Sequence, residues 1–315
     1  MNCLCCGKPL KPNEETGWHK TCIKRFFGTS TLPEIRIDNR TLAKLAIEMT
    51  SNGFTVPGVQ KKLSLHLISD RRNPRLTLMN CPTGYILKPQ VPEYRALPES
   101  EQLIMEMADV ASIKTVPHAL IKVGDSVAYI TKRIDRRLIN GTTEMLAMED
   151  FCQLDHRLTE DKYKGSYERC QKIIQRYSSR VGIDRTEFYI RLVFCFLVGN
   201  SDMHLKNFSL IETEEGSNQY ILSPAYDLLP VSVIIPEDTE QLALTINGKK
   251  KNIHKNDFIK FAESCGISHN VAEKLIENLI CFVPEWLRMC EESTLPTDLK
   301  ELLKRIITER AEALK

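Results

Sequence analysis

Residues 199–207 read GNSDMHLKN, and they follow an almost uncharged apolar stretch, FYIRLVFCFLV, at residues 188–198. Any polar turn could end a buried helix, yet this loop holds Asp202 and Asn207 five positions apart, with a histidine and a lysine between them. Carboxylate and amide oxygens are the ligands that hard divalent cations prefer. The stretch therefore predicts a metal- and phosphate-binding loop that is supported by a rigid core helix.

The bulk composition is that of a globular protein. The 315 residues predict about two domains or one bilobal unit, and 42% hydrophobic with 27% charged residues allow a sizeable core. The formal net charge of +2 argues against a global field for nucleic acid or an anionic membrane. The longest strongly apolar run, residues 192–198, is far shorter than the roughly 20 residues that span a bilayer.

Cysteine usage predicts a cytoplasmic protein. The N-terminal stretch MNCLCCGKPL lacks the apolar segment of a secretion signal. The eleven cysteines are an odd number, and after Cys22 they are scattered singly along the chain. Reduced thiols explain this pattern better than a disulfide framework does.

The order of hydrophobic patterns predicts an α+β fold with two lobes. We expect a helix at 39–50, then a Pro-Gly turn that leads into a strand within 54–68, and further strands at 75–80, 84–89, 118–124 and 126–134, interrupted by a helix at 98–111. Later we expect helices at 166–181, 184–198, 255–265, 268–282 and 294–314, with a strand pair at 208–213 and 219–223. The predicted parts are a small Cys/His module at 1–30, a β-rich lobe at 31–140 and a helical lobe at 141–315.

Three oxygen-bearing side chains have the spacing of a phosphoryl-transfer site. The chain has no G-x-x-x-x-G-K-[ST] loop. Protein kinases instead place an aspartate and an asparagine five apart, with a second aspartate after a strand pair, as in Asp202, Asn207 and Asp227. Asp202 would accept a hydroxyl proton, while Asn207 and Asp227 would hold Mg²⁺. The alternative is a polar turn in which Asp202 is only a cap.

A lysine and a glutamate supply the next part of such a site. Lys88, in GYILKPQ, shares a strand face with Ile86, and a buried lysine needs a partner. Glu101 falls beside the apolar stripe of the helix at 98–111, while Glu99 and Glu106 fall on its far side. An ion pair would hold Lys88 toward the nucleotide phosphates. The alternative is a strand-end lysine that extends to water.

VPGVQKK, at residues 56–62, is the candidate phosphate loop. Gly58 lets backbone N–H groups approach phosphate oxygens, and Val59 and Gln60 would contribute to the same nest. Taken alone, a Pro-Gly pair can equally be an ordinary turn.

Five ordered motifs resemble the HipA-like serine/threonine kinases, the toxin halves of bacterial toxin–antitoxin operons. They are FTVPGVQKKLSL, YILKP, ITKRIDR, LVGNSDMHLKNFSL and SPAYDLLP, and the resemblance runs from about residue 30 to the C-terminus. It is closest to the short HipT branch, in which a separate small protein of HipS type supplies a missing N-terminal subdomain. The resemblance implies a protein-kinase-like bilobal fold, ATP with Mg²⁺, and phosphorylation of a protein hydroxyl.

The resemblance also implies roles for individual residues and partners. Asp202 is then the catalytic aspartate, Lys88 the ATP lysine and Glu101 its partner, with Asn207 and Asp227 as metal ligands. The backbone of Thr131, Lys132 and Arg133 would contact adenine, and His204 would brace the catalytic loop at the nucleotide site rather than act as a base. Known targets of the family are aminoacyl-tRNA synthetases, and DNA is reached only through an antitoxin of HipB type.

One motif departs from the HipT pattern. HipT-like kinases carry Ser-x-Ser before the phosphate-loop glycine, where autophosphorylation regulates the enzyme. This chain has Thr55, Val56 and Pro57 there, so we predict Thr55 as the autophosphorylation site of that loop. A phosphate on Thr55 would repel the phosphates of ATP.

The first residues hold a separate candidate metal site. Cys3, Cys6, His19 and Cys22 have the order C-x₂-C-x₁₂-H-x₂-C, which suits a closed structural Zn²⁺. The alternative is a set of reduced thiols and a surface imidazole, and the neighbouring Cys5 leaves the ligand set open.

Two other function classes remain. A small-molecule phosphotransferase of the antibiotic- or choline-kinase type shares the D-x₄-N loop, and a non-catalytic adaptor could use the same fold. The adaptor hypothesis expects at least one lost catalytic residue, whereas the five expected residues are all present. The basic run NGKKKN at 247–252 is expected to be a solvated hairpin tip. Phe282 and Trp286 lie four apart on a late predicted helix and are expected to pack in the hydrophobic core.

Overall fold

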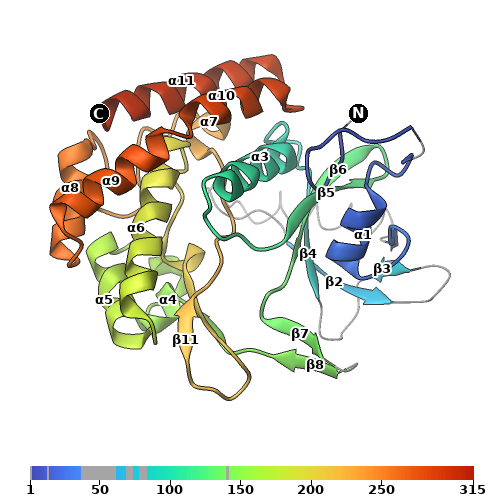
Figure 1. Ribbon diagram of the computed structural model, residues 1–315, viewed down its shortest axis with the longest axis horizontal. Helices are drawn as coiled ribbons and strands as arrows, with labels where there is room; N and C mark the ends of the chain where they lie inside the picture. The colour runs from blue at the N-terminus through green and yellow to red at the C-terminus, as the bar shows by residue number, and fades with distance from the viewer. Residues whose placement is uncertain (1, 13, 37–61, 69–73, 78–83, 140–141) are drawn as a thin grey trace. The chain divides into compact units, whose positions relative to one another are not determined.

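The computed structural model describes residues 2–12, 14–36, 62–68, 74–77, 84–139 and 142–315 (Figure 1). The chain forms two compact units, Met1–Gln102 with Val116–Thr143, and Leu103–Thr115 with Glu144–Lys315. The expected helix at 39–50 and the candidate phosphate loop, with Thr55, Gly58, Val59 and Gln60, lie outside the described residues. The three-part division at residues 30 and 140 stays a prediction.

A six-stranded sheet organises the first unit, in the order β1-β3-β2-β4-β6-β5. Its strands are β1 (Glu34–Arg36), β2 (Leu63–Ile68), β3 (Arg75–Thr77), β4 (Tyr85–Pro89), β5 (His118–Val123) and β6 (Ser126–Lys132). β1 pairs with β3 in parallel, and the other neighbours are antiparallel. Five of these strands fall within the predicted segments, whereas the three-residue β1 was not predicted.

Helix α1 (Lys20–Phe27) packs its apolar residues against this sheet. It ends at Gly28, which has the left-handed φ of 74° that closes many helices. Buried side chains of the N-terminal segment, of α1 and of β2, β4, β5 and β6 form one hydrophobic cluster. The buried side chains before and within α1 therefore share the core of the sheet.

Helix α3 (Leu97–Val110) begins in the first unit and continues in the second. Its apolar stripe is as the periodicity predicts: Ile104, Met107 and Ala108 are fully buried. Glu101 is also fully buried, whereas Glu99 and Glu106 are partly exposed. The face assigned to each glutamate from 100° spacing is therefore correct.

The second unit is mostly helical around a small sheet. Its helices are α4 (Phe151–Leu154), α5 (Tyr167–Tyr177), α6 (Val181–Leu197), α7 (Val231–Ile234), α8 (Lys255–Ser264), α9 (His269–Ile280), α10 (Val283–Glu292) and α11 (Thr297–Ala313), with 3₁₀ turns η1 (Thr159–Asp161) and η2 (Leu205–Asn207). β9 (Met148–Asp150), β10 (Ser209–Glu212) and β11 (Tyr220–Leu222) form an antiparallel sheet with β10 in the centre. β7 (Arg136–Ile139) and β8 (Thr142–Met145) form a separate pair, most of which belongs to the first unit.

Some predicted helix boundaries are wrong. The segment expected to be helical through residue 181 ends at Tyr177, because Ser178 is extended and donates its hydroxyl to the buried Asp184. Phe282 is the N-cap of α10 rather than an interior residue of the same helix as Trp286. Trp286 is nevertheless fully buried, and its indole nitrogen donates to the Met107 carbonyl oxygen at 3.1 Å.

Helix α6 is the central rod of the second unit, and its residues from 192 to 197 are fully buried. The guanidinium of Arg310 on α11 donates to the Phe196 carbonyl oxygen at 2.7 Å, so it satisfies one of the orphan carbonyls at the helix end. Gly199 then turns the chain with φ 78°, and its carbonyl oxygen accepts from Ser232 N at 2.9 Å. The loop after α6 therefore begins at a helix end that is held in place by contacts with α11 and Ser232.

Among the described residues, no helix combines the length and the apolar composition that crossing a membrane requires.

We predict that Gly199→Ala destabilises the second unit more than Gly216→Ala does. Both glycines have left-handed φ, 78° and 73°, which costs an alanine about 1–2 kcal/mol. A Cβ at Gly199 would also meet Ile306 Cγ2 at 3.2 Å, whereas one at Gly216 would meet nothing within 4 Å. Overpacking of this kind adds roughly 1–3 kcal/mol. Urea unfolding measures the difference, and equal losses for the two variants would contradict it.

Candidate active site and metal cluster

A buried ion pair occupies the first unit. Lys88 on β4 is 3% exposed and Glu101 on α3 is fully buried, and Lys88 Nζ donates to Glu101 Oε1 at 2.5 Å. The ammonium also lies 5.2 Å from the ring centroid of Tyr129, which is opposite Lys88 on β6. A buried ammonium needs a compensating charge, and Glu101 provides it. The pair expected from the sequence is therefore present in the structure.

The loop after α6 is held by hydrogen bonds within itself. Asn207 Nδ2 donates to the Asp202 carbonyl oxygen at 2.9 Å, and Asp202 N donates to Asn200 Oδ1 at 3.2 Å. Because Asn207 uses its amide nitrogen here, its amide oxygen is the atom that could serve a cation. His204 Nδ1 accepts from Lys206 N, as an N-cap does for a short helix. His204 thus supports the loop backbone.

The carboxyl group of Asp202 lies in an environment that opposes its ionisation. Burial is the largest influence on the pKa of Asp202, which is raised to about 7. The carboxylates of Asp227 and Asp238 also raise it. The hydroxyl of Tyr163, which donates to Asp202 Oδ1 at 2.6 Å, acts in the opposite direction, as does Lys162. A bound cation would relieve the repulsion between Asp202 and Asp227.

Asp227 adopts an unusual backbone conformation. Its φ of 61° lies in the left-handed region, which non-glycine residues adopt mainly where the surroundings impose it. Two residues earlier, Ala225 N donates to the Lys114 carbonyl oxygen at 2.7 Å. The segment after β11 is thus fixed so that Asp227 interacts with Asp202, and the oxygen donors suit a hard divalent cation.

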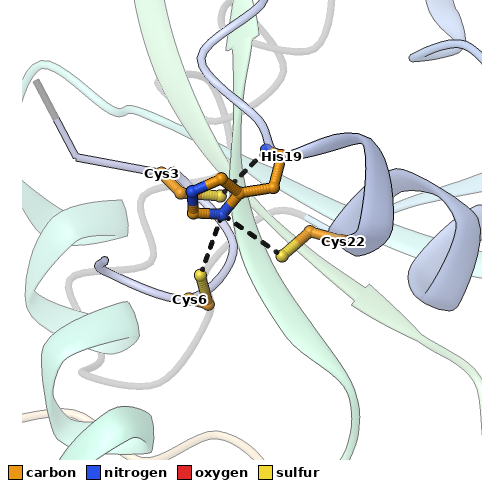
Figure 2. Close-up of side chains that lie close together, drawn as sticks. All are labelled: Cys3, Cys6, His19 and Cys22. Carbon is orange, nitrogen blue, oxygen red and sulfur yellow. Dashed lines mark hydrogen bonds between the residues drawn. The ribbon is translucent and has the colours of Figure 1, made fainter. Parts of the chain in front are cut away.

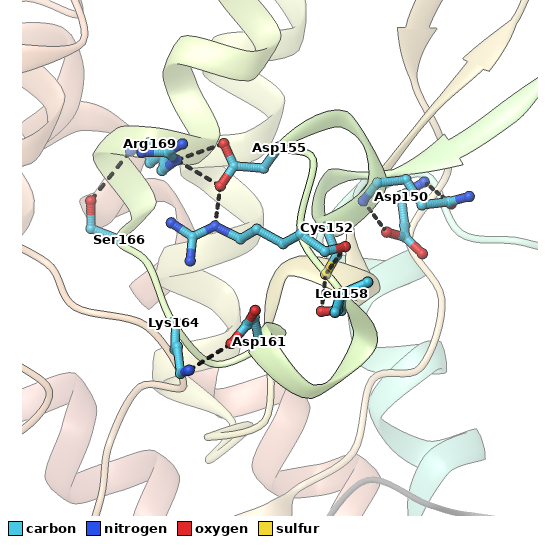
Figure 3. A network of polar contacts seen from close by, with 10 residues as sticks. Asp150, Cys152, Asp155, Leu158, Asp161, Lys164, Ser166 and Arg169 are labelled. Carbon is cyan, nitrogen blue, oxygen red and sulfur yellow. Dashed lines mark hydrogen bonds and ion pairs between the residues drawn. The ribbon is translucent and has the colours of Figure 1, made fainter.

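Tyr163 is a site residue that the sequence did not reveal. It precedes Asp202 by 39 positions and belongs to no motif, so only the fold brings the two together. A polar network fixes its segment: Asp155 accepts from Arg169 at 2.6 Å, and Lys164 pairs with Asp161 at 2.6 Å (Figure 3). Leu205 N donates to the Lys162 carbonyl oxygen at 3.2 Å, which connects this segment to the loop.

Lys206, within GNSDMHLKN, had no predicted role. Its Nζ contacts Asp150 Oδ2 at 2.7 Å, and Asp150 also caps α4 through Gln153 N. The lysine therefore joins the loop to the start of α4. In the run NGKKKN, Lys249 and Lys250 pair with Asp257 and Glu240, so these two lysines are engaged within the second unit.

The segment expected to contact adenine ends β6. Lys132 N donates to the Pro117 carbonyl oxygen and Arg133 N to the Gly84 carbonyl oxygen, both at 2.9 Å. Thr131 is buried, and its hydroxyl donates to Pro117 O at 3.0 Å. These donors serve the first unit itself, and the adenine contact stays a prediction.

The four predicted metal ligands lie together in the first unit (Figure 2). The ligand atoms of Cys3, Cys6, His19 and Cys22 are all within 4.8 Å of one another. Cys5 is not a member of the group, and burial raises the pKa of its thiol to about 11. The structure therefore resolves which three thiols accompany His19.

Sequence comparisons relate the chain to one family of proteins. The family described as HipA-like C-terminal domain matches residues 54–287. The serine/threonine-protein kinase toxin HipA of Shewanella oneidensis is 26% identical over 264 residues, which cover 78% of this chain and 58% of that protein. The chain spans 55–58% of the length of three curated relatives that it matches.

Two solved structures share the fold. One is HipA of Shewanella oneidensis MR-1, in a complex with HipB and operator DNA, with TM-score 0.68 and 21% identity over 86% of this chain and 70% of that one. The other is the Helicobacter pylori proinflammatory kinase CtkA, with TM-score 0.54 and 14% identity over 78% and 90% of the two chains. The predicted α+β, kinase-like fold is confirmed.

We predict strong coupling between Lys88 and Glu101 in a double-mutant cycle. Glu101→Leu leaves a buried ammonium without its charge partner and should cost about 3–5 kcal/mol of unfolding free energy. Lys88→Met combined with Glu101→Leu should cost much less, because both charges are removed. Urea unfolding of the three variants gives the coupling energy. The exposed pair Arg288–Glu285 is the control, and Glu285→Leu should change stability far less than Glu101→Leu does. Additive losses at Lys88 and Glu101 would contradict the prediction.

We predict that Asp202→Asn stabilises the magnesium-free protein at pH 8 by roughly 1–3 kcal/mol. Because the native pKa of Asp202 is raised to about 7, the native state holds a proton that the unfolded chain releases near pH 4. Stability therefore falls as pH rises between these values, and asparagine removes that loss. Urea unfolding at pH 4 and pH 8, with a chelator present, should show the gain only at the higher pH.

The matched control is Glu312→Gln, which changes an exposed ion pair with Lys315. It should alter stability by less than about 1 kcal/mol at either pH. A loss of stability in Asp202→Asn at pH 8 would show that the Asp202 carboxylate is not strained.

Proposed function

Because the chain belongs to the HipA-like C-terminal domain family, we propose that it is an ATP- and Mg²⁺-dependent serine/threonine protein kinase acting as the toxin of a toxin–antitoxin pair. The observation that carries this proposal is the buried ion pair of Lys88 and Glu101. Protein kinases use such a pair to hold a lysine on the α/β-phosphates. A protein that only bound partners would have no need of so costly a buried charge.

The residues of the second unit supply the remaining roles. Asp202 accepts the proton of the attacking hydroxyl, and Tyr163 orients its carboxylate through the 2.6 Å hydrogen bond. Asn207 and Asp227 would hold Mg²⁺ through oxygen atoms. Bound ATP with Mg²⁺ supplies the phosphoryl group and neutralises charge on it. The proposal also includes phosphate contacts by Gly58, Val59 and Gln60, adenine contacts by Thr131–Arg133, and a structural Zn²⁺ at the cysteine cluster.

Substrate, regulation and partners are further parts of the proposal. The substrate is a protein hydroxyl of the translation machinery, such as that of an aminoacyl-tRNA synthetase, in the cytoplasm. Thr55 is the regulatory autophosphorylation site, where a phosphate would repel ATP. The chain acts as a HipT-like short kinase with a HipS-type small protein and a HipB-type antitoxin. A solved relative is held with HipB and operator DNA, which supports an antitoxin partner that carries the DNA contact.

We predict that the native protein transfers labelled phosphate from ATP to a protein in host lysate in the presence of Mg²⁺. Asp202→Ala should lower the rate at least about 100-fold, because the general base contributes about 10²–10⁴-fold. Mass spectrometry identifies the labelled substrate and maps phosphate on the kinase itself, where Thr55 is expected.

Two controls make the result decisive. Glu312→Ala, at an exposed position of the same unit, should keep the activity. A panel of small alcohols in an ADP-release assay should give no turnover. Turnover of an alcohol without protein labelling would favour a small-molecule phosphotransferase, and ATP binding without any transfer would favour a non-catalytic adaptor.

A further inference from the structure

We propose that Cys3, Cys6, His19 and Cys22 hold a closed structural Zn²⁺ that orders the N-terminal segment and thereby supports β4, the strand that carries Lys88. The inference stands on the first unit alone and does not depend on the kinase activity.

The distances between the ligand atoms match tetrahedral zinc. Zn–S bonds of about 2.3 Å and Zn–N bonds of about 2.0 Å place an S and an N ligand roughly 3.5 Å apart and two S ligands roughly 3.8 Å apart. His19 Nδ1 lies 3.4 Å from Cys6 Sγ and 3.8 Å from Cys22 Sγ (Figure 2). All four ligand atoms lie within 4.8 Å of one another. A single ion can therefore contact all four with small adjustments.

The imidazole of His19 is already oriented as a ligand. Its Nε2 lies 3.0 Å from the Pro9 carbonyl oxygen, which can only accept, so Nε2 carries the proton. Nδ1 then presents its lone pair to the sulfur atoms of Cys6 and Cys22. Metal-binding histidines are commonly fixed in this way through their second nitrogen.

Cys3 and Cys6 lie in a tight turn that suits metal binding. Cys3 N donates to the Lys8 carbonyl oxygen at 2.8 Å, and Gly7 N donates to the Cys3 carbonyl oxygen at 2.9 Å. Gly7 closes the turn with φ 67°, a conformation that glycine adopts without strain. His19 N approaches Cys3 Sγ at 3.4 Å, so a backbone N–H is directed at the sulfur atom that would carry negative charge.

The four side chains form a complete ligand set of three sulfurs and one nitrogen. A site with four protein ligands leaves no position for substrate or water, which is the pattern of structural rather than catalytic zinc. A cavity of about 580 Å³ borders Cys6, His19 and Cys22, so a chelator can approach the ion from solvent.

The segment before α1 has little regular secondary structure of its own. Among the described residues from 2 to 19, the only regular pairing is the β-bridge between Asn2 and Pro9. So short a segment cannot bury enough surface to order itself, and metal binding can supply the missing free energy.

The ordered segment contacts the sheet directly and also through α1. Leu4, inside the turn, accepts through its carbonyl oxygen from Leu120 N on β5 at 2.8 Å. Trp18, next to the ligand His19, is 1% exposed and packs on Phe27 at 5.4 Å between ring centroids. Phe27 in turn packs on Tyr85 of β4 at 5.4 Å.

Tyr85 completes the connection to the ion-paired lysine. Its hydroxyl donates to the Phe26 carbonyl oxygen at 3.3 Å, and it lies three residues before Lys88 on the same strand. Loss of the metal should therefore loosen the aromatic packing beneath β4.

The test begins with metal analysis of the purified full chain. We expect about one Zn²⁺ per chain in the native protein and in Cys5→Ser, whose thiol lies outside the ligand group. Cys22→Ser should lose most of the metal, whereas His19→Cys should keep it, because four thiolates also form a structural site. Co²⁺ exchanged into the native protein should give the visible spectrum of a tetrahedral site with sulfur ligands.

Hydrogen exchange then measures the coupling between the metal site and β4 in the native protein, so this test does not depend on whether a variant folds. After chelation, amides of Tyr85–Lys88 should exchange about tenfold faster or more, while those of Ser209–Glu212 in the second unit should not change. A metal-free native protein, Zn²⁺ retained at full occupancy in Cys22→Ser, or unchanged exchange in β4 after complete removal of the metal would overturn the inference.

Discussion

The ammonium group of Lys88 is the constraint on which the first unit depends. A lysine that is 3% exposed on a central strand cannot remain charged without a partner, so α3 must present a carboxylate at that position. Glu101 does so because it flanks the apolar stripe of α3 and is carried inward with it. The position of the strand and the rotation of the helix are thereby fixed together. An apolar pair would satisfy packing alone, so the buried charges indicate a functional requirement.

The same conflict between stability and function recurs in the second unit. Asp202 is partly buried, and its raised pKa, to which the carboxylate of Asp227 contributes, records the cost of that arrangement. The buried helix α6, the Arg310 contact at its end and the Tyr163 hydroxyl hold the Asp202 loop in place despite this cost. Asp227 adds a left-handed backbone conformation. Charges and strain of this kind are found together where a site is prepared for a ligand that compensates them.

The sequence predicts what depends on local periodicity and misses what depends on particular tertiary contacts. β4, β6 and α6 follow from alternation and apolar spacing, and the inward face of Glu101 follows from 100° per residue. The end of α5 depends on a side-chain bond from Ser178 to Asp184, which no propensity encodes. Tyr163 reaches Asp202 from 39 residues away. The spacing of the cysteines could not separate Cys5 from the ligand group, because the path of the turn decides it.

The N-terminal segment shows why composition alone underestimates a short module. Taken by itself, a polar stretch of fewer than thirty residues has no core, and the sequence suggested an appendage. Trp18, Phe26 and Phe27 instead join the hydrophobic cluster of the sheet. Aromatic rings bury large areas but can do so only if the backbone that carries them is fixed. The proposed Zn²⁺ at Cys3, Cys6, His19 and Cys22 would fix that backbone with four side chains, where a hydrophobic core would need many more.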